Sequence, residues 1–290
     1  MIGLAFLVTI GLVLVGALTY WHLITAEGAY LGPRVVAWTY DWVARRYDAI
    51  KRFNSRDEDW FVAGPVLRGL AGVERPLVLD VATGTGRLPL ALLRSHLAPG
   101  GQIVGLDLSR RMLSQARAKL GPYGGERVFL LWQDASHLPF NDGTFDAVTC
   151  LEALEFLPRP REALAEMVRV LAPGGLFLVT NRVGPSARWL PGRTISRAEF
   201  EPALAALALH RIETGRWQVD YDLVAAVKVG ERQPAGRAGV DLPALLRCPA
   251  CDGRLRAGPA SLKCAGCERS FGIENGVVAL ATTDGQRHSQ

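Results

Sequence analysis

The amino-terminal part of the sequence lacks charge. From Ile2 to Ile24 it contains no Asp, Glu, Lys or Arg, whereas 21% of the whole 290-residue chain is charged. As a helix rising ~1.5 Å per residue, this segment would span roughly 35 Å, enough to cross the hydrocarbon core of a bilayer. A basic region before the run and a small-residue cleavage site after it are both missing, which argues against a secretory signal peptide. We predict a single-pass membrane anchor in residues 1–26 that contacts the bilayer through Ile2–Ile24.

The residues that flank this segment indicate its orientation. Tyr20, Trp21 and His22 stand at its far end, and amphipathic rings favour the headgroup zone of a membrane. Basic side chains follow the segment, and only the amino terminus precedes it. The positive-inside rule therefore places the bulk of the chain in the cytoplasm. The basic residues are Arg34, Arg45, Arg46, Lys51 and Arg52.

Cysteine is also scarce, and four of the five cysteines form two C-x-x-C pairs: Cys248, Cys251, Cys264 and Cys267. This spacing is typical of a metal site rather than a disulfide framework, and four thiolates complete a tetrahedral zinc site with no open catalytic position. So short a segment cannot bury a sufficient core, and zinc would supply most of its stability. Cys150 stands in an apolar run and is expected in the core. Unpaired thiols favour a reduced, cytosolic setting.

The overall composition excludes a disordered chain, because 49% of the residues are hydrophobic. The net charge of +5 is compatible with binding to a nucleic acid or to an anionic lipid surface and does not distinguish the two. Aromatic and basic residues do not alternate as they would on a platform for single-stranded nucleic acid, so a nucleic-acid partner is the less favoured of the two.

The stretch from Pro76 to Leu92 predicts a buried strand, a tight glycine turn and a helix. A strand that ends in glycines exposes backbone N–H groups to a ligand. The third glycine of the usual dinucleotide fingerprint is missing, because Pro89 stands in its place. The turn is therefore not expected to hold a pyrophosphate.

Acidic residues follow the next two predicted strands. Asp107 ends the run from Gln102, just over twenty residues past the glycine turn, where its oxygens can accept from both hydroxyls of a ribose. Asp134 and Ala135 follow the strand predicted at Val128–Trp132, where a carboxylate and a backbone N–H can recognise adenine. Both positions indicate an adenosine-containing cofactor.

Four motifs carry a family resemblance: D-x-x-x-G-x-G at Asp80–Gly86, the run at 138–150, E-M-V-R-V-L-A-P-G-G at 166–175, and Y-D-x-x-A-x-x-Y-D at 40–48. Together they resemble the S-adenosylmethionine-dependent methyltransferases of the ubiquinone/menaquinone-biosynthesis type. The resemblance implies an α/β, Rossmann-like seven-stranded sheet. It also implies that S-adenosylmethionine is held by Asp80, Ala82, Thr83, Gly84, Gly86, Asp107, Leu108, Met112, Asp134 and Ala135.

Candidate catalytic residues come from two places. The resemblance implies that Tyr47 and Asp48, in a helix predicted over Tyr40–Asn54, help to close the site. Glu152 and Glu155 follow the strand predicted at Phe145–Cys150, and open α/β sheets bind their substrates at this edge. We take Glu152 as the candidate contact with substrate and Glu155 as a second polar contact; the alternative is that both are exposed acids at a helix start.

The remaining chain completes the predicted organisation. A predicted helix at Arg161–Leu171 ends at P-G-G and is followed by a strand at Leu176–Thr180. A loop is expected at Gly184–Arg193, and a capping box at Ser196–Glu199 indicates the start of another helix. Strands at Arg211–Gly215 and Tyr221–Val229 would close the sheet. We expect an anchor (1–26), a methyltransferase domain (27–230), a linker (231–241), a zinc ribbon (242–281) and a disordered tail (282–290).

The predicted activity is methyl transfer from S-adenosylmethionine to a lipophilic small molecule of quinone, isoprenoid or lipid type, at a membrane. The carboxyl-terminal segment resembles the small zinc-ribbon protein that activates RNA and protein methyltransferases. An RNA or protein methyltransferase that uses the ribbon for recognition, or for binding a partner protein, is therefore the alternative. A membrane-tethered scaffold is a third interpretation, which the intact acids at 80, 107 and 134 disfavour.

Overall fold

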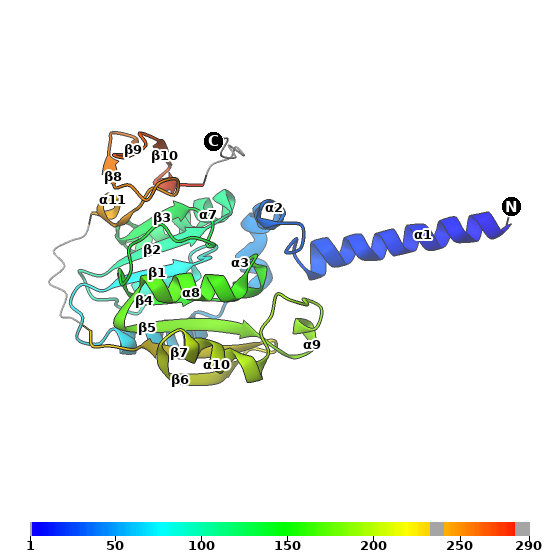
Figure 1. Ribbon diagram of the computed structural model, residues 1–290, viewed down its shortest axis with the longest axis horizontal. Helices are drawn as coiled ribbons and strands as arrows, with labels where there is room; N and C mark the ends of the chain where they lie inside the picture. Colours follow the sequence, from blue (N-terminus) through cyan, green and yellow to red (C-terminus); the bar gives the residue numbers. More distant parts are fainter. Residues whose placement is uncertain (1, 233–240, 282–290) are drawn as a thin grey trace.

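The computed structural model describes residues 2–232 and 241–281, and its centre is a mixed β-sheet (Figure 1). Seven strands run in the order β6-β7-β5-β4-β1-β2-β3. β1 pairs in parallel with β2 and β4, while β7 is antiparallel to both β5 and β6. The strands are β1 Leu77–Val81, β2 Gln102–Asp107, β3 Val128–Trp132, β4 Phe145–Cys150, β5 Leu171–Arg182, β6 Leu209–Trp217 and β7 Tyr221–Lys228. All seven predicted strands and the α/β fold are confirmed.

The helices that pack on the sheet cover it because they present apolar stripes to it. Two buried clusters result, one containing Leu79, Phe145 and Phe177 and the other containing Val78, Leu92 and Leu113. Cys150 is fully buried, as predicted. The α-helices are α1 Ile2–Tyr20, α2 Pro33–Val43, α3 Tyr47–Lys51, α4 Ser55–Asp57, α5 Gly64–Gly69, α6 Arg87–Arg94, α7 Arg110–Leu120, α8 Pro160–Val170, α9 Gly184–Ala187, α10 Arg197–Ala206 and α11 Leu242–Leu245. Shorter turns of helix are η1 Trp21–Thr25, η2 Ala44–Arg46, η3 Glu58–Ala63, η4 Gly121–Tyr123, η5 Gly125–Arg127 and η6 Leu154–Phe156.

The carboxyl-terminal segment continues this sheet. Its strands β8 Leu255–Ala257, β9 Ser261–Cys264, β10 Ser270–Glu274 and β11 Val277–Ala279 extend the order beyond β3. β11 pairs in parallel with β3, with Val278 opposite Leu131. Figure 1 shows this segment at the β3 edge, at the opposite end of the sheet from β6 and β7. The seven-stranded sheet that was predicted is therefore part of an eleven-stranded one, because β11 covers the β3 edge.

Several local predictions differ from the structure. Tyr40–Asn54 is not one helix but α2, η2 and α3, ended by Arg52 in a left-handed conformation (φ 50°). The P-G-G run lies inside β5, where the pairing with β4 shifts register, rather than in a turn before the strand. The Ser196 hydroxyl donates to the Glu199 side chain (2.9 Å) and makes no bond to a backbone N–H. The predicted tail, and residues 233–240 of the predicted linker, lie outside the described residues.

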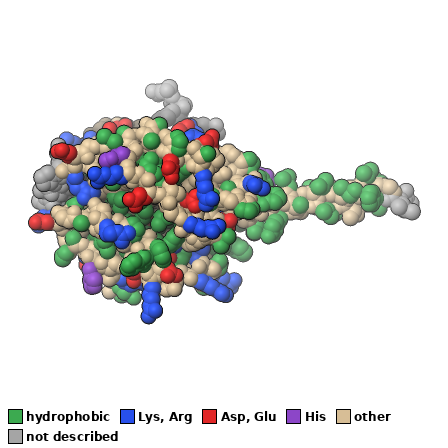
Figure 2. Space-filling view, turned by 90° about the horizontal axis from the view of Figure 1, so that it is seen from below, with side chains coloured by type: hydrophobic (Ala, Val, Ile, Leu, Met, Phe, Trp, Pro, Cys, Tyr) green, Lys and Arg blue, Asp and Glu red, His purple; other side chains and the backbone are tan. Residues whose placement is uncertain are grey.

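The amino-terminal helix projects from the body (Figure 1), and its side chains from Gly3 to Tyr20 are exposed. Figure 2 shows this projecting segment covered by hydrophobic side chains. Within the described residues, Gly3–Thr25 is the one stretch of helix long and apolar enough to cross a membrane. By length and composition it fits a membrane anchor or a signal sequence.

Candidate functional site

The glycine turn between β1 and α6 is held from below by Asp80. This buried carboxylate accepts hydrogen bonds from the hydroxyls of Thr83 (2.6 Å) and Thr149 (2.7 Å). Burial raises the pKa of Asp80 to about 6, although the two hydroxyls oppose the shift. Asp80 and Thr83 thus lie beneath the turn and fix its shape.

Asp107 connects the turn to the end of β2. Its Oδ2 accepts from the backbone N–H of Gly84 (2.8 Å) and its Oδ1 from that of Ser109 (2.8 Å). Burial raises the pKa of Asp107 to about 6, and these backbone donors oppose the shift. A carboxylate oxygen has two acceptor sites, so both oxygens can accept a further hydrogen bond from a ligand.

A cavity of about 100 Å³ opens over the ends of β1, β2, β3 and β4. This is the edge at which open parallel sheets bind ligands. Residues expected to contact the cofactor or substrate line it: Tyr47, Ala82, Gly84, Asp107, Leu108, Asp134, Ala135 and Glu152. Residues that the sequence indicated in five separate segments therefore line one cavity.

The cavity wall fits an adenosine-containing cofactor in two further respects. The side-chain oxygen of Gln133 is buried and has no hydrogen-bond partner, so it is free to accept from a ligand. A Cβ atom at Gly84 would meet no atom within 4 Å, and the backbone there (φ 54°) is open to a ligand. The chain thus offers an unpaired acceptor and bare backbone beside Asp107.

The other expected residues lie outside this cavity. Met112 is 1% exposed and packs in the core, and Gly86 (φ 76°) begins α6 with Leu120 against it. The Asp48 carboxylate accepts from the Thr85 hydroxyl (2.5 Å) and from the Lys119 ammonium (2.7 Å). Asp48 therefore clamps α3 onto the glycine turn.

Glu152 is the centre of a charged network at the cavity wall. Its carboxylate accepts from Arg87 (2.6 Å), Lys51 (2.9 Å) and Gln218 (2.9 Å). Burial works against the charge, but Lys51 and Arg87 outweigh it and lower the pKa of Glu152 to about 2. Glu152 also has a left-handed backbone (φ 53°), a costly conformation for a residue with a Cβ. A carboxylate held in this way orients and polarises its neighbours and is a weak base.

Glu155 belongs to a second buried network. It is 1% exposed and accepts from the Tyr221 hydroxyl and from Arg182 (3.3 Å), while its Oε2 has no partner. Burial raises its pKa. Burial also raises the pKa of Tyr47 well above its usual range, so the Tyr47 hydroxyl stays protonated and able to donate at neutral pH.

The sequence did not indicate the role of α2. Its residues Pro33, Val36, Ala37 and Tyr40 line the cavity and cover it. Their helical spacing was a usable signal for a buried face. Arg87 and Gln133 were also missed, because their roles depend on partners distant in the sequence.

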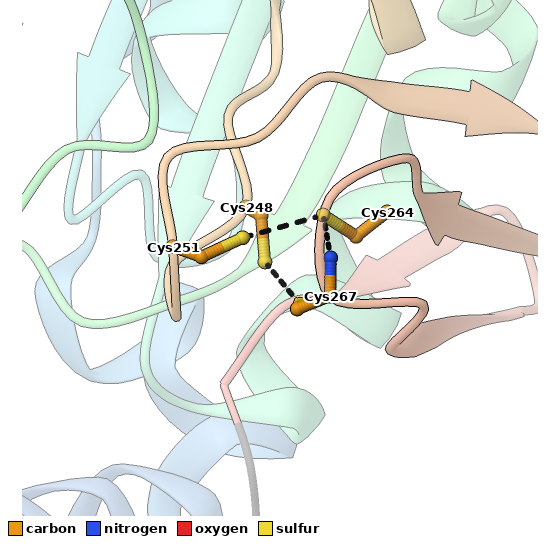
Figure 3. Close-up of side chains that lie close together, drawn as sticks. All are labelled: Cys248, Cys251, Cys264 and Cys267. Atoms are coloured by element: carbon orange, nitrogen blue, oxygen red, sulfur yellow. Dashed lines mark hydrogen bonds between the residues drawn. The ribbon is translucent and has the colours of Figure 1, made fainter.

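The four ribbon cysteines meet at one point (Figure 3). All their sulfurs lie within 4.8 Å of one another, with Cys248 and Cys267 at 3.6 Å and Cys251 and Cys264 at 3.5 Å. Sulfurs around a tetrahedral zinc ion stand about 3.8 Å apart, so this cluster has the spacing of a metal site. Backbone N–H groups of Cys267 and Gly266 lower the pKa of Cys264 to about 6, which favours a thiolate ligand.

Comparison with known proteins adds to this geometry. A family model described as a methyltransferase domain matches residues 79–179. The chain is 36% identical over 193 residues to the demethylmenaquinone methyltransferase of Parafrankia sp. (strain EAN1pec), covering 61% of this chain and 73% of that enzyme. It is 38% identical over 149 residues to the enzyme of the same name from Clavibacter sepedonicus, covering 51% and 58%, and 42% identical over 139 residues to that of Thermus thermophilus, covering 47% and 61%. The chain thus spans between about three fifths and three quarters of the length of these relatives.

Solved structures share the fold. The [4+2]-cyclase SpnF superposes with a TM-score of 0.57 at 21% identity, over 69% of this chain and 97% of that one. A chain of the complex between the Haloferax volcanii Trm112 methyltransferase activator and a methyltransferase superposes with a TM-score of 0.52 at 24% identity, over 66% of this chain and 96% of that one. At these identities the likeness establishes the fold, and the site must establish the chemistry.

Proposed function

Because this chain belongs to the S-adenosylmethionine-dependent methyltransferase family that includes the demethylmenaquinone enzymes, we propose that it methylates a lipophilic small molecule at a membrane. The acceptor would be of quinone, isoprenoid or lipid type. One observation carries this proposal: α2 covers the cavity at the strand ends with a largely apolar face. α2 begins only eight residues after Thr25, where the exposed apolar helix ends. Such a roof suits an apolar acceptor.

In this proposal the cofactor lies along the strand ends. Asp107 accepts from the ribose hydroxyls, Asp134 and Ala135 recognise the adenine, Leu108 packs on its ring, and Gly84 brings bare backbone to the amino-acid end. Gln133 supplies a further acceptor. When bound, S-adenosylmethionine supplies an electrophilic methyl group on a sulfonium.

The chain's own residues would position the acceptor and exclude water, which is the main work in such a transfer. Tyr47 donates a hydrogen bond to an acceptor oxygen, because burial keeps its hydroxyl protonated. Glu152 holds its charge beside the cavity through Arg87 and Lys51. Asp48 keeps α3 closed over the turn through Thr85 and Lys119. The roof formed by α2 keeps solvent from the methyl group.

The exposed apolar helix, as a membrane anchor, would support this choice of substrate. Residues 3–25 would cross the bilayer once, with Tyr20 and Trp21 at the headgroups and the catalytic body in the cytoplasm. An anchored enzyme is held at the bilayer, into which lipophilic acceptors partition. The four cysteines would hold structural zinc. The ribbon is joined to the catalytic sheet through the pairing of β11 with β3.

The alternative is an RNA or protein methyltransferase that uses the ribbon for recognition. The exposed sides of Cys251 and Cys267 leave part of the ribbon accessible to a partner. The pairing of β11 with β3 favours a structural role for the ribbon over a recognition role. The apolar exposed helix also favours a lipophilic acceptor.

The test uses full-length protein in detergent, radiolabelled S-adenosylmethionine and a total cell extract, followed by separation into organic and macromolecular phases. We expect label in the organic phase. Label in RNA or protein would replace the proposal with the alternative. Cofactor binding by calorimetry with no label in either phase would contradict both.

A further inference from the structure

Helix α2 has two faces with different partners. Pro33, Val36, Ala37 and Tyr40 line the cavity. The opposite face presents Arg34, Trp38 and Trp42, which stand four residues apart and form one row along the helix. Trp38 is 60% exposed and Trp42 is 75% exposed. Two neighbouring exposed tryptophans form an apolar patch, and burying them would remove a large apolar area from water.

A second element presents the same chemistry. Trp189, which follows α9, is 60% exposed, and Arg188 beside it is exposed too. This loop is tied to the base of the projecting helix: the Tyr30 hydroxyl donates to the Pro191 carbonyl (2.8 Å) and Arg193 donates to the Ala29 carbonyl (2.5 Å). Figure 1 shows α2 and α9 at the end of the body from which α1 projects.

We propose that this surface, formed by Leu31, Arg34, Trp38, Trp42, Arg188 and Trp189 and called the interfacial surface below, rests on the headgroup region of an anionic bilayer. The proposal rests on the membrane anchor of the proposed function and adds a second contact to it. Tryptophan is the side chain that prefers the boundary between lipid and water, and arginine attracts anionic headgroups. α2 is then an interfacial helix on one face and the roof of the cavity on the other.

Charge favours a bilayer over a protein partner for this surface. Its two charged side chains, Arg34 and Arg188, are both basic. The acid in α2, Asp41, faces α7: it accepts from the Ser109 hydroxyl (2.5 Å) and from the Arg111 backbone N–H (3.1 Å). Trp21, at the end of the projecting helix, stacks on Tyr30 with ring centroids 5.1 Å apart. The aromatic belt of the membrane segment therefore continues into the loop that carries Trp189.

The surface also explains how an acceptor reaches the cavity. A groove of about 970 Å³ runs beside Arg34 and Trp38. Pro33, Ala37 and Leu108 line both the groove and the cavity, so the two lie next to each other. With the interfacial surface on the bilayer, this groove opens at the headgroups. The acceptor class is therefore a molecule dissolved in the bilayer, which enters without crossing bulk water.

The test is photo-crosslinking with full-length protein in vesicles of phosphatidylcholine and phosphatidylglycerol. A benzophenone amino acid is placed at Trp38, Trp42 or Trp189. The matched control is Tyr123, which is 51% exposed in η4, the short turn after α7, and lies outside the interfacial surface. A positive control is Leu12 in α1. We expect lipid adducts at 38, 42 and 189 to exceed those at 123 by roughly tenfold, as for side chains seated in the interface.

Adducts at 38, 42 and 189 no more frequent than at 123, while Leu12 crosslinks, would overturn the proposal and leave the anchor standing. No adducts at Leu12 would remove the anchor and the proposal together. The double variant Trp42→Ser/Trp189→Ser distinguishes membrane contact from activity, because neither tryptophan lines the groove or the cavity. We expect its KM for an acceptor in vesicles to rise several-fold while its cofactor affinity and its rate on detergent-dispersed acceptor stay unchanged. Absence of any activity of the unaltered protein on detergent-dispersed acceptor would instead count against the proposed function.

Discussion

Arg87 and Glu152 form a buried ion pair, Nη1 to Oε1 2.6 Å, that joins the helix after the glycine turn to the loop after β4. The same guanidinium binds both oxygens of Glu58, at 2.5 and 2.8 Å. Its plane also lies over the Phe53 ring, 4.3 Å from the centroid. One arginine thus connects four segments around the site.

Removing Arg87 should therefore cost far more than removing an ordinary surface arginine. Arg87→Met leaves the buried Glu58 and Glu152 without their shared partner, and we expect the free energy of unfolding to fall by about 3–5 kcal/mol. Arg94→Met is the matched control, because its pair with Asp59 is more exposed and is worth about 1 kcal/mol or less. Urea unfolding of the two variants measures the difference. Equal losses would contradict the network.

The same pair predicts a response to acid. The pKa of Glu152 is about 2 in the folded protein, below the usual value of 4.5 for a glutamate. Its charge therefore stabilises the fold above pH 4.5, and this stabilisation is lost as the pH falls toward 2. In Glu152→Gln the acid-induced loss of stability between pH 4.5 and 3 should be smaller than in the unaltered protein. Melting curves at several pH values measure this. An identical pH dependence in both proteins would show that the ion pair does not form.

Much of this site follows from the sequence, because strand ends can be read from apolar runs. Asp107 and Asp134 close such runs, and parallel strands bring their ends to one edge. The partners of a side chain, by contrast, cannot be read from the sequence around it. Nothing in the spacing of Glu152 indicates Arg87, 65 residues away, or Lys51, 101 residues away. The pairing of β11 with β3 is equally non-local, since a three-residue strand carries no signal for its partner edge.

The cofactor affinity should depend on pH through Asp107. Its pKa is about 6 in the free protein, and hydroxyl donors of a bound ribose favour the ionised form. Protonation as the pH falls below about 6 therefore weakens binding of S-adenosylmethionine. Calorimetry between pH 5 and 8 should show this decline in the unaltered protein. Asp107→Asn should bind weakly, by roughly tenfold or more, with a flatter pH profile. Unchanged affinity in this variant would refute the assignment of Asp107.

The ribbon should support the adenine side of the site. β11 pairs along β3, and the backbone N–H groups of Leu280 (3.1 Å) and Ala281 (2.9 Å) both donate to the Trp132 carbonyl, next to Gln133 and Asp134. Cys248→Ser removes one of the four proposed zinc ligands and should lower the melting temperature by roughly 10 °C. It should also weaken cofactor binding by about tenfold, or about 1.4 kcal/mol.

The control for this variant is Glu268→Gln, which removes only an exposed pair with Lys263. Native mass spectrometry reports the metal bound per chain, and calorimetry reports the cofactor affinity. If a zinc-free Cys248→Ser protein binds S-adenosylmethionine as tightly as the control, the ribbon does not support cofactor binding.

The two glycines of the turn should fail in different ways when replaced by alanine. Gly84 (φ 54°) and Gly86 (φ 76°) both have left-handed backbones, which cost a side chain about 1–2 kcal/mol each. At Gly86 a Cβ would also stand 3.0 Å from the Leu120 side chain and 3.3 Å from that of Ala116, so Gly86→Ala strains the packing of α6 on α7. At Gly84 a Cβ meets no protein atom within 4 Å and lies beside the cavity. Gly86→Ala should therefore lose more stability in urea, and Gly84→Ala should lose more cofactor affinity in calorimetry. If Gly84→Ala binds S-adenosylmethionine as well as the unaltered protein does, the cofactor does not pass over this turn.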